Sequence, residues 1–337
     1  TGPDPTGIVG KERRSGALGV RNGPLPEGRK TRMPAPKLRK AFNARGVFIF
    51  AMTPFLSTKN RRGEYELDLD GIQKNVAHYC EVPGEKAVVI CGGSGEYHSL
   101  RPKEILAAAE AAVAGGDGQT KIVCGVGGAN RSMLKLAQDV QEAGVDAVLV
   151  MPHEPIVRRG EKAIWDRHQL LAKSIDIGFI PFRSPKQLLT IDLVAKFAEQ
   201  EQVVAIKEES GAVDWVRTGR RITGNAVSFI TGGGENMVPY YYLAGAVGFT
   251  SGMANLSLGR SVELHNRAIR ADWPLAMELR DFFEPLTEMR REMGTPMLKA
   301  GLEMLDLAGG PVRETGEVLD AAGRRRLRRL LEEKDLL

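Results

Sequence analysis

Short apolar segments alternate with helix-like segments along most of this chain, and this alternation limits the fold more than any other feature. Eight of the apolar segments are short, rich in β-branched residues and free of polar alternation, which is typical of buried parallel strands. They are Val47–Met52, Ala87–Cys91, Lys121–Val126, Ala147–Met151, Gly178–Phe182, Val203–Lys207, Val227–Thr231 and Ala246–Ser251. Helical periodicity fills the stretches between them. The pattern predicts an α/β fold, a closed (β/α)8 TIM barrel.

The rest of the chain lies on either side of the barrel, which we place at residues 46–257. Residues 258–337 contain more helical stretches than one closing helix needs, so they predict a small C-terminal helical appendage: Leu258–Ile269, Pro274–Met293, Pro296–Leu307 and Leu319–Glu333. Residues 1–45 are rich in glycine, proline and arginine. Such a composition predicts a basic extension that is disordered or loosely attached. Met33 could also be the true start, which would make the preceding residues an artefact.

The charge of +5 is unevenly distributed along the chain. Residues 1–45 hold 11 basic against 3 acidic side chains, and the remaining 292 residues hold 36 against 39, so the globular part has a net charge of −3. Nucleic-acid binding would therefore depend on the extension alone, and we do not expect it. No apolar stretch approaches the roughly 20 residues of a membrane helix. Three cysteines without metal-ligand spacing favour a reducing, cytoplasmic location and no metal.

Lys207 closes the apolar run of the sixth predicted strand. Active sites of such barrels lie at the C-terminal ends of the strands. Desolvation at the edge of an apolar interior disfavours the ammonium and lowers its pKa, which frees an amine that can attack a carbonyl carbon. In the alternative interpretation Lys207 only pairs with Glu208 or Glu209. We expect these two glutamates to make an ion pair at the rim rather than to act as a base.

A glycine-rich loop, Gly92-Gly93-Ser94-Gly95-Glu96, follows the second strand. Glycines allow the backbone to approach a ligand closely, and successive amides with a serine hydroxyl form an anion site that suits a small carboxylate. The alternative is a tight turn that binds nothing. The spacing matches neither a dinucleotide nor a P-loop fingerprint. Glu96 is a candidate acceptor that orients the loop amides.

Five segments in this strand order resemble the dihydrodipicolinate synthase/N-acetylneuraminate lyase family of Schiff-base-forming class I aldolases and dehydratases. The resemblance extends from about Gly46 to about Arg313. It depends on Thr53-Pro54-Phe55, the glycine-rich loop with Ser99-Leu100, Ile206-Lys207-Glu208, Thr231-Gly232-Gly233, and the run from Gly248 to Asn255.

The resemblance implies roles for particular side chains and for the whole protein. Lys207 would form an imine with a small-molecule 2-oxo acid, either pyruvate or the pyruvate-like end of a sugar acid. Gly93 and Ser94 would hold the substrate carboxylate, and Thr53 would lie near the proton relay. Phe182, Thr250 and Gly232 would contribute to the substrate pocket. No cofactor or metal is implied, and the expected assembly is a homotetramer or dimer.

The chain also departs from the family pattern. Phe182 takes the strand-five position of a tyrosine whose hydroxyl relays protons, and phenylalanine cannot do this. His153 and Glu154 replace the tyrosines usual after strand four, and either could transfer protons instead. Both could equally be ordinary surface residues. Arg183 and Lys186 are candidates for the arginine expected beyond strand five.

Three functional hypotheses follow. The first is a lyase that forms an imine through Lys207 and catalyses aldol cleavage, condensation, or dehydration of a 3-deoxy-2-oxo sugar acid. Asp176-Ile177-Gly178 and Gly310-Pro311-Val312-Arg313 are similar to the deoxy-oxoglucarate dehydratase branch. Dihydrodipicolinate synthase activity is less expected, because the tyrosines of strands four and five are missing. The second hypothesis is a catalytically altered or non-catalytic barrel that binds a small oxo acid. The third is nucleic-acid binding through the basic extension.

Overall fold

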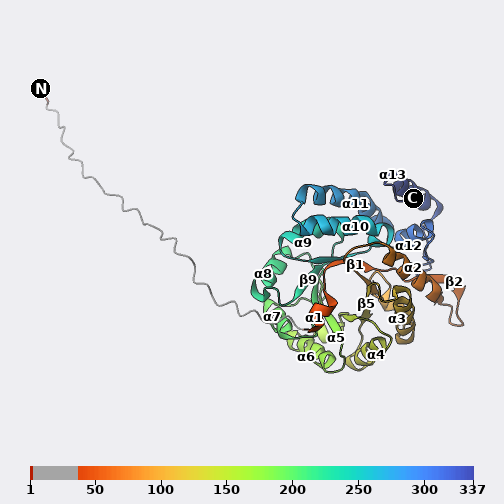
Figure 1. Cartoon of the computed structure of the whole chain (residues 1–337), viewed down its shortest axis with the longest axis horizontal. Helices are drawn as coiled ribbons and strands as arrows, with labels where there is room; N and C mark the ends of the chain where they lie inside the picture. Colours follow the sequence, from red (N-terminus) through yellow and green to blue (C-terminus); the bar gives the residue numbers. More distant parts are fainter. Residues whose placement is uncertain (3–36) are drawn as a thin grey trace. The chain divides into compact units, whose positions relative to one another are not determined.

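A computed structural model describes residues 1–2 and 37–337 of the chain. Eight parallel strands close into a barrel in the order β1-β10-β9-β8-β7-β6-β5-β4 (Figure 1). The strands are β1 (Gly46–Phe50), β4 (Lys86–Ile90), β5 (Lys121–Val126), β6 (Ala147–Val150), β7 (Gly178–Arg183), β8 (Ala205–Glu208), β9 (Ser228–Thr231) and β10 (Gly248–Ser251). The predicted fold class is confirmed, and each predicted strand is present.

Helices surround the barrel and separate successive strands (Figure 1). They are α2 (Leu69–Glu81), α3 (Pro102–Gly116), α4 (Asn130–Glu142), α6 (Glu161–Ala172), α7 (Ile191–Glu199), α8 (Val213–Thr223), α9 (Val238–Leu243) and α10 (Ala254–Ile269). Two short 3₁₀ turns, η1 (Tyr97–Ser99) and η2 (Glu235–Met237), lie after β4 and β9. Three of the helices begin at a side chain that accepts a hydrogen bond from a free amide of the first turn: Asp68 before α2, Thr190 before α7 and Asp320 before α13 (Ala321–Glu333). At α7 the Thr190 hydroxyl accepts a 3.2 Å hydrogen bond from Leu193 N.

Strand alternation separates two apolar layers. Phe48 and Phe50 of β1 belong to the cluster inside the barrel, whereas Val47 and Ile49 pack outward against the helices. The same period places Ala205 of β8 inside and Ile206 outside. Because successive side chains of a strand face opposite sides, Lys207 shares the inner face with Ala205.

The helix α1 (Lys37–Phe42) attaches the segment before β1 to the barrel. The Arg39 guanidinium donates to Val203 O at 2.7 Å and also to the carbonyls of Phe197, Gln200 and Ala226. Phe42 packs with the cluster inside the barrel. Residues 37–45 therefore differ from the loosely attached extension that their composition predicts. The expectations for residues 3–36, including a start at Met33, lie outside the described residues.

The sequence patterns missed α1, the short helix α5 (Glu154–Val157), and both strands of a hairpin, β2 (Phe55–Lys59) and β3 (Tyr65–Leu67). All but the first residue of β2 are exposed, so the hairpin lacks the apolar alternation by which half-buried strands are recognised.

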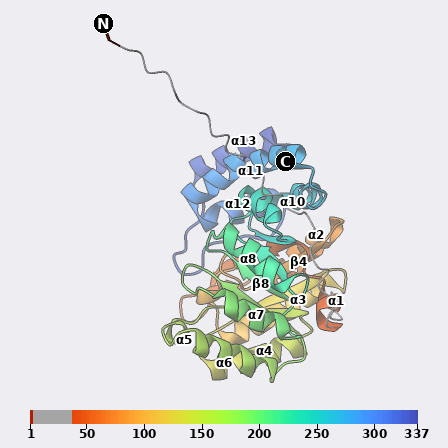
Figure 2. The same ribbon diagram turned by 90° about the vertical axis from the view of Figure 1, so that its left-hand side faces the viewer.

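The C-terminal appendage consists of α11 (Trp273–Met293), α12 (Thr295–Met304) and α13 (Ala321–Glu333), which lie together beside the barrel and α10 (Figure 2). Their apolar side chains form one cluster with Met52 and Met253 at the ends of β1 and β10. None of the helices within residues 37–337 is long and apolar enough to cross a membrane.

Candidate active site

A cavity of about 200 Å³ opens at the C-terminal ends of the barrel strands. Lys207, Phe182, Gly93, Ser94 and Thr250, each singled out in the sequence, meet in its wall. The other lining residues are Phe50, Glu209, Gly233, Gly234, Ser251 and Gly252. Lysine, carboxylate and glycine-rich backbone thus surround one space of small-molecule size.

The Lys207 side chain lies between two aromatic rings and is only 3% exposed. Its Nζ is 3.9 Å from the ring centroid of Phe182 and 4.2 Å from that of Phe50. Nζ also makes an ion pair with Glu209. Burial lowers the pKa of Lys207, and the Glu209 carboxylate opposes this shift. The desolvation expected from the sequence is therefore present, and it favours a free amine.

Strand register explains this arrangement. Phe182 and Lys207 are direct partners across β7 and β8. Phe50, the last residue of β1, supplies the second ring. It was not predicted as a site residue, because a phenylalanine at the end of an apolar strand usually belongs to the core. The two-residue period of β1 could have predicted its position, since it places Phe50 on the inner face of the barrel with Phe48.

The glycine-rich loop forms another part of the wall. A Cβ at Gly93 would meet nothing within 4 Å, so this backbone faces open space, whereas a Cβ at Gly92 would lie 2.8 Å from the Phe50 ring. The loop begins at Cys91, which has a left-handed φ of +51°. Thr53 Oγ1 donates a 2.6 Å hydrogen bond to Gly95 O. Thr53 thus supports the loop and does not line the cavity.

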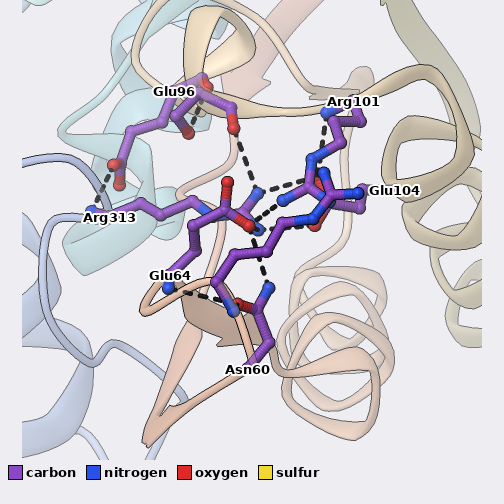
Figure 3. Close-up of polar contacts among 8 residues, drawn as sticks. Asn60, Glu64, Glu96, Arg101, Glu104 and Arg313 are labelled. Carbon is purple, nitrogen blue, oxygen red and sulfur yellow. Dashed lines mark hydrogen bonds and ion pairs between the residues drawn. The ribbon is translucent and has the colours of Figure 1, made fainter.

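A polar network fastens the same loop to the C-terminal appendage (Figure 3). Glu96 Oε1 makes an ion pair with Lys299 Nζ of α12 at 2.6 Å. Glu96 Oε2 accepts a 2.8 Å hydrogen bond from Arg313 N. Arg313 in turn binds Glu104 of α3 through both nitrogens, at 2.9 and 2.5 Å, and donates to Ser99 O at 3.1 Å.

Glu96 was expected to orient the loop amides. Its side chain instead reaches outward to the appendage, so it holds the whole loop in place rather than its individual amides. Bidentate contacts between arginine and carboxylate have fixed geometry, which makes the attachment at Arg313 rigid. The side chains of Lys299 and Arg313 are almost completely buried.

The structure does not bring His153 to the cavity. His153 precedes α5, is partly exposed, and is not among the residues that line the cavity. Burial, with a smaller contribution from Arg167, lowers its pKa. Glu154 makes an exposed ion pair with Arg158. The geometry therefore supports neither of these residues as a proton relay at Lys207.

Arg183 and Glu208 form a buried ion pair behind the cavity, with 2.6 Å between Nη1 and Oε2. Arg183 also stacks on Trp215, 4.6 Å from the ring centroid. The expectation of a rim ion pair is therefore wrong for Glu208, which is fully buried, whereas Glu209 does pair with Lys207. Lys186, the other candidate for the position of the arginine expected beyond strand five, is exposed and does not line the cavity.

Gly232 lies behind the cavity wall rather than in it. Its N–H donates a 2.6 Å hydrogen bond to Glu208 O, while the next residues, Gly233 and Gly234, line the cavity. A Cβ at Gly232 would lie 2.4 Å from Glu209 Cγ. Within the described part of the chain, no group of three or more potential ligands could hold a metal ion.

The lysine-containing cavity lies at the C-terminal ends of the barrel strands, which is where the active sites of TIM-barrel enzymes are found, and it is therefore the candidate active site. The chain belongs to the dihydrodipicolinate synthetase family, whose family model matches residues 43–334. It is 28% identical over 292 residues to 4-hydroxy-tetrahydrodipicolinate synthase of Methanospirillum hungatei, covering 85% of this chain and 97% of that protein.

A second relative is named for a different reaction. The chain is 28% identical over 287 residues to the probable 5-dehydro-4-deoxyglucarate dehydratase of Rhizobium meliloti, covering 83% of this chain and 92% of that protein. Among solved structures, dihydrodipicolinate synthase from Oceanobacillus iheyensis superposes with a TM-score of 0.77 at 23% identity, covering 89% of this chain and all of the other. The chain is thus an enzyme of the lyase and dehydratase type.

Proposed function

We propose that this protein is a lyase that forms a Schiff base between Lys207 and a small 2-oxo acid, either pyruvate or a 2-oxo-3-deoxy sugar acid. One observation carries the proposal: the Lys207 amine is buried between two aromatic rings and faces a small cavity whose wall includes Gly93 and Ser94. Desolvation favours the nucleophilic amine. The exposed backbone of Gly93 and the Ser94 hydroxyl supply donors for a carboxylate.

The chemistry follows from an amine next to a carboxylate site. The amine attacks the carbonyl carbon at position 2, and loss of water gives a protonated imine in which nitrogen carries the positive charge. This imine draws electrons from the adjacent carbon, which eases loss of a proton or cleavage of a carbon–carbon bond there. Binding of the substrate carboxylate by the loop would orient the reacting carbon.

Two reactions are compatible with the proposed imine. One is aldol cleavage or condensation and the other is dehydration, because one relative is named as a synthase and another as a probable dehydratase. Dehydration is favoured by the segments Asp176-Ile177-Gly178 and Gly310-Pro311-Val312-Arg313, which are similar to the dehydratase branch, although that branch normally keeps the tyrosine that Phe182 replaces. Incubation with a 2-oxo-3-deoxy sugar acid, followed by product analysis by NMR, would distinguish the two reactions.

Borohydride reduction in the presence of pyruvate tests imine formation directly. We expect the intact mass to increase by one reduced pyruvate and peptide mapping to place it on Lys207. Lys207→Arg should show no increase, while Lys162→Arg, at an exposed lysine of α6, should react like the wild type. No adduct with any member of a panel of 2-oxo acids would exclude the proposal.

A binding protein without turnover is the second candidate, favoured by the lack of a hydroxyl at Phe182. An adduct that forms readily, without consumption of any 2-oxo acid in the panel, would support it.

A further inference from the structure

We propose that Glu209 carries the protons of this reaction in place of the tyrosine hydroxyl that Phe182 lacks, and that Gly232 is required because it leaves room for the Glu209 side chain. This inference rests on the proposed imine at Lys207. Three observations support it: the residues that line the cavity, the contact between Glu209 and Lys207, and the packing of Gly232.

Glu209 carries the one carboxylate among the described residues that line the cavity. Ser251 Oγ already donates a 2.5 Å hydrogen bond to the buried Glu235 and accepts one of 2.8 Å from Ala254 N. The remaining hydroxyls, those of Ser94 and Thr250, are much weaker acids and bases than a carboxylate, so neither is a good general base near neutral pH. Carboxylates are among the usual general acids and bases of enzymes.

The position of Glu209 suits proton transfer at the imine. Its Oε2 makes an ion pair with Lys207 Nζ, the atom that would become the imine nitrogen. The Glu209 side chain is 44% exposed, whereas that of Lys207 is 3% exposed. Glu209 can therefore exchange protons with bulk water while it contacts the amine of a side chain that is almost completely buried.

The backbone on both sides holds Glu209 in this position. Glu209 N donates a 2.9 Å hydrogen bond to Arg183 O of β7. The preceding residue, Glu208, is fixed by its buried ion pair with Arg183 and by hydrogen bonds from Ser210 N and Oγ, both 2.7 Å. Because the backbone is tied down, the Glu209 side chain has little freedom to avoid a new neighbour.

Gly232 is that neighbour. A Cβ there would lie 2.4 Å from Glu209 Cγ and 2.9 Å from Glu209 Cβ, and both distances are too short for carbon atoms. An alanine would therefore push the carboxylate away from Lys207. The absence of a side chain at Gly232 makes the contact between Glu209 and Lys207 sterically possible.

The proton transfers balance as follows. The Glu209 carboxylate takes a proton from the Lys207 ammonium, and the freed amine adds to carbon 2 of pyruvate. One proton of the attacking nitrogen passes to the former carbonyl oxygen, which gives a neutral carbinolamine. The Glu209 carboxyl then returns its proton to that hydroxyl, the carbon–oxygen bond breaks, water leaves, and the product is the protonated imine. Glu209, again a carboxylate, then removes a proton from the methyl carbon. The carbon–hydrogen electron pair becomes the carbon–carbon double bond of a neutral enamine. Reversal of this last step in D2O returns deuterium to that carbon.

Exchange of the pyruvate methyl hydrogens in D2O, followed by proton NMR, tests the assignment, with borohydride trapping measured in parallel. Glu209→Gln should slow the exchange by about 100-fold, the scale of general acid–base catalysis, while the adduct at Lys207 still accumulates during long incubation. Gly232→Ala should slow exchange in the same way. Glu110→Gln, on the exposed side of α3, and Gly259→Ala, where a Cβ meets nothing within 4 Å, are matched controls that should behave like the wild type.

The outcomes separate this inference from the proposed function. If the wild type traps neither pyruvate nor another 2-oxo acid, the imine itself is excluded. If it does trap pyruvate but Glu209→Gln exchanges at the wild-type rate, the proton-carrier role is wrong and the imine stands. Complete loss of the adduct in folded Glu209→Gln, even after long incubation, would also overturn the assignment, because a proton carrier changes the rate of imine formation and not whether the imine forms. Wild-type exchange in Gly232→Ala would refute the steric role of the glycine.

Discussion

The ion pair between Glu96 and Lys299 offers the sharpest test of how the glycine-rich loop is held. Lys299 Nζ has two polar contacts in the structure, Glu96 Oε1 at 2.6 Å and Pro311 O at 2.7 Å. Its side chain is 1% exposed. The substitution Glu96→Gln keeps the shape of the side chain and removes its charge, so it leaves a buried ammonium facing one carbonyl oxygen and a neutral amide.

Removing one partner of a buried ion pair typically costs about 3–5 kcal/mol of unfolding free energy. Glu96 retains 11% exposure, so water can partly replace it, and we expect a loss of about 3 kcal/mol for Glu96→Gln. The double variant with Lys299→Met should lose less than Glu96→Gln alone, because no uncompensated charge remains. Glu154→Gln, which breaks an exposed pair with Arg158, should change stability by less than about 1 kcal/mol. Urea unfolding followed by circular dichroism measures all three.

The pH dependence of the unfolding free energy is a second, independent test of the ion pair between Glu96 and Lys299. Burial lowers the pKa of Lys299 below the ordinary value of 10.5, and the Glu96 charge opposes that shift. Without the charge, the pKa of Lys299 in the folded state falls further. Between the folded and unfolded pKa values the unfolded chain binds more protons, so stability rises with pH in that window. The stability deficit of Glu96→Gln should therefore shrink as the pH rises from neutral toward 10.5, the ordinary lysine value.

Two results would refute this reasoning. One is a loss below about 1 kcal/mol for Glu96→Gln, which would mean that water or a rearranged side chain solvates Lys299. The other is a deficit that grows with pH, which would mean that the ammonium is not the destabilised form. A folded Glu96→Gln variant should also bind the 2-oxo acid more weakly, because the loop that carries Gly93 and Ser94 loses its attachment to α12.

Two further predictions concern the active-site lysine and a tight turn. Since burial lowers the pKa of Lys207, the rate of adduct formation with pyruvate should reach its midpoint below pH 10.5, the ordinary lysine value; a midpoint at or above that of N-acetyl-lysine would contradict it. Gly310→Ala should cost at least ~2 kcal/mol in urea unfolding, because its Cβ would lie 1.9 Å from Phe55 O at a φ of +76°. Gly63→Ala has a similar φ of +78° but open space around the Cβ, so it should cost only about 1 kcal/mol, and equal losses at the two sites would refute the clash.

Features with a local signature could be predicted from the sequence. Each barrel strand has a continuous apolar run, because both faces of a barrel strand are buried. The sequence could predict that Lys207, Gly93 and Ser94 lie close together, because the C-terminal ends of barrel strands meet at one face. His153 and Thr53 both come after a strand, but neither lines the cavity, so their positions in the sequence were not enough to predict their roles. Lying after a strand places a side chain near the active-site face, but does not determine which way it points.

The different positions of Glu208 and Glu209 could have been predicted from the two-residue period of a strand. Residues two apart share a face, so Lys207 and Glu209 belong together and Glu208 faces the opposite layer. The structure has this arrangement, with Glu208 buried against Arg183. The contribution of Gly232 had no such signal, because it depends on how closely the chain after β9 approaches the chain after β8.

Contacts between distant parts of the chain had no sequence signature at all, and they connect the appendage to the active site. Glu96 of the loop meets Lys299 and Arg313, and Met52 at the end of β1 shares one apolar cluster with Leu298. Residues 37–337 accordingly fall within one compact unit. A chain cut after residue 257 would keep all eight strands but expose this cluster and leave Glu96 without its cation. The C-terminal helices therefore help to hold the glycine-rich loop in place, and the barrel and the appendage are not expected to unfold independently.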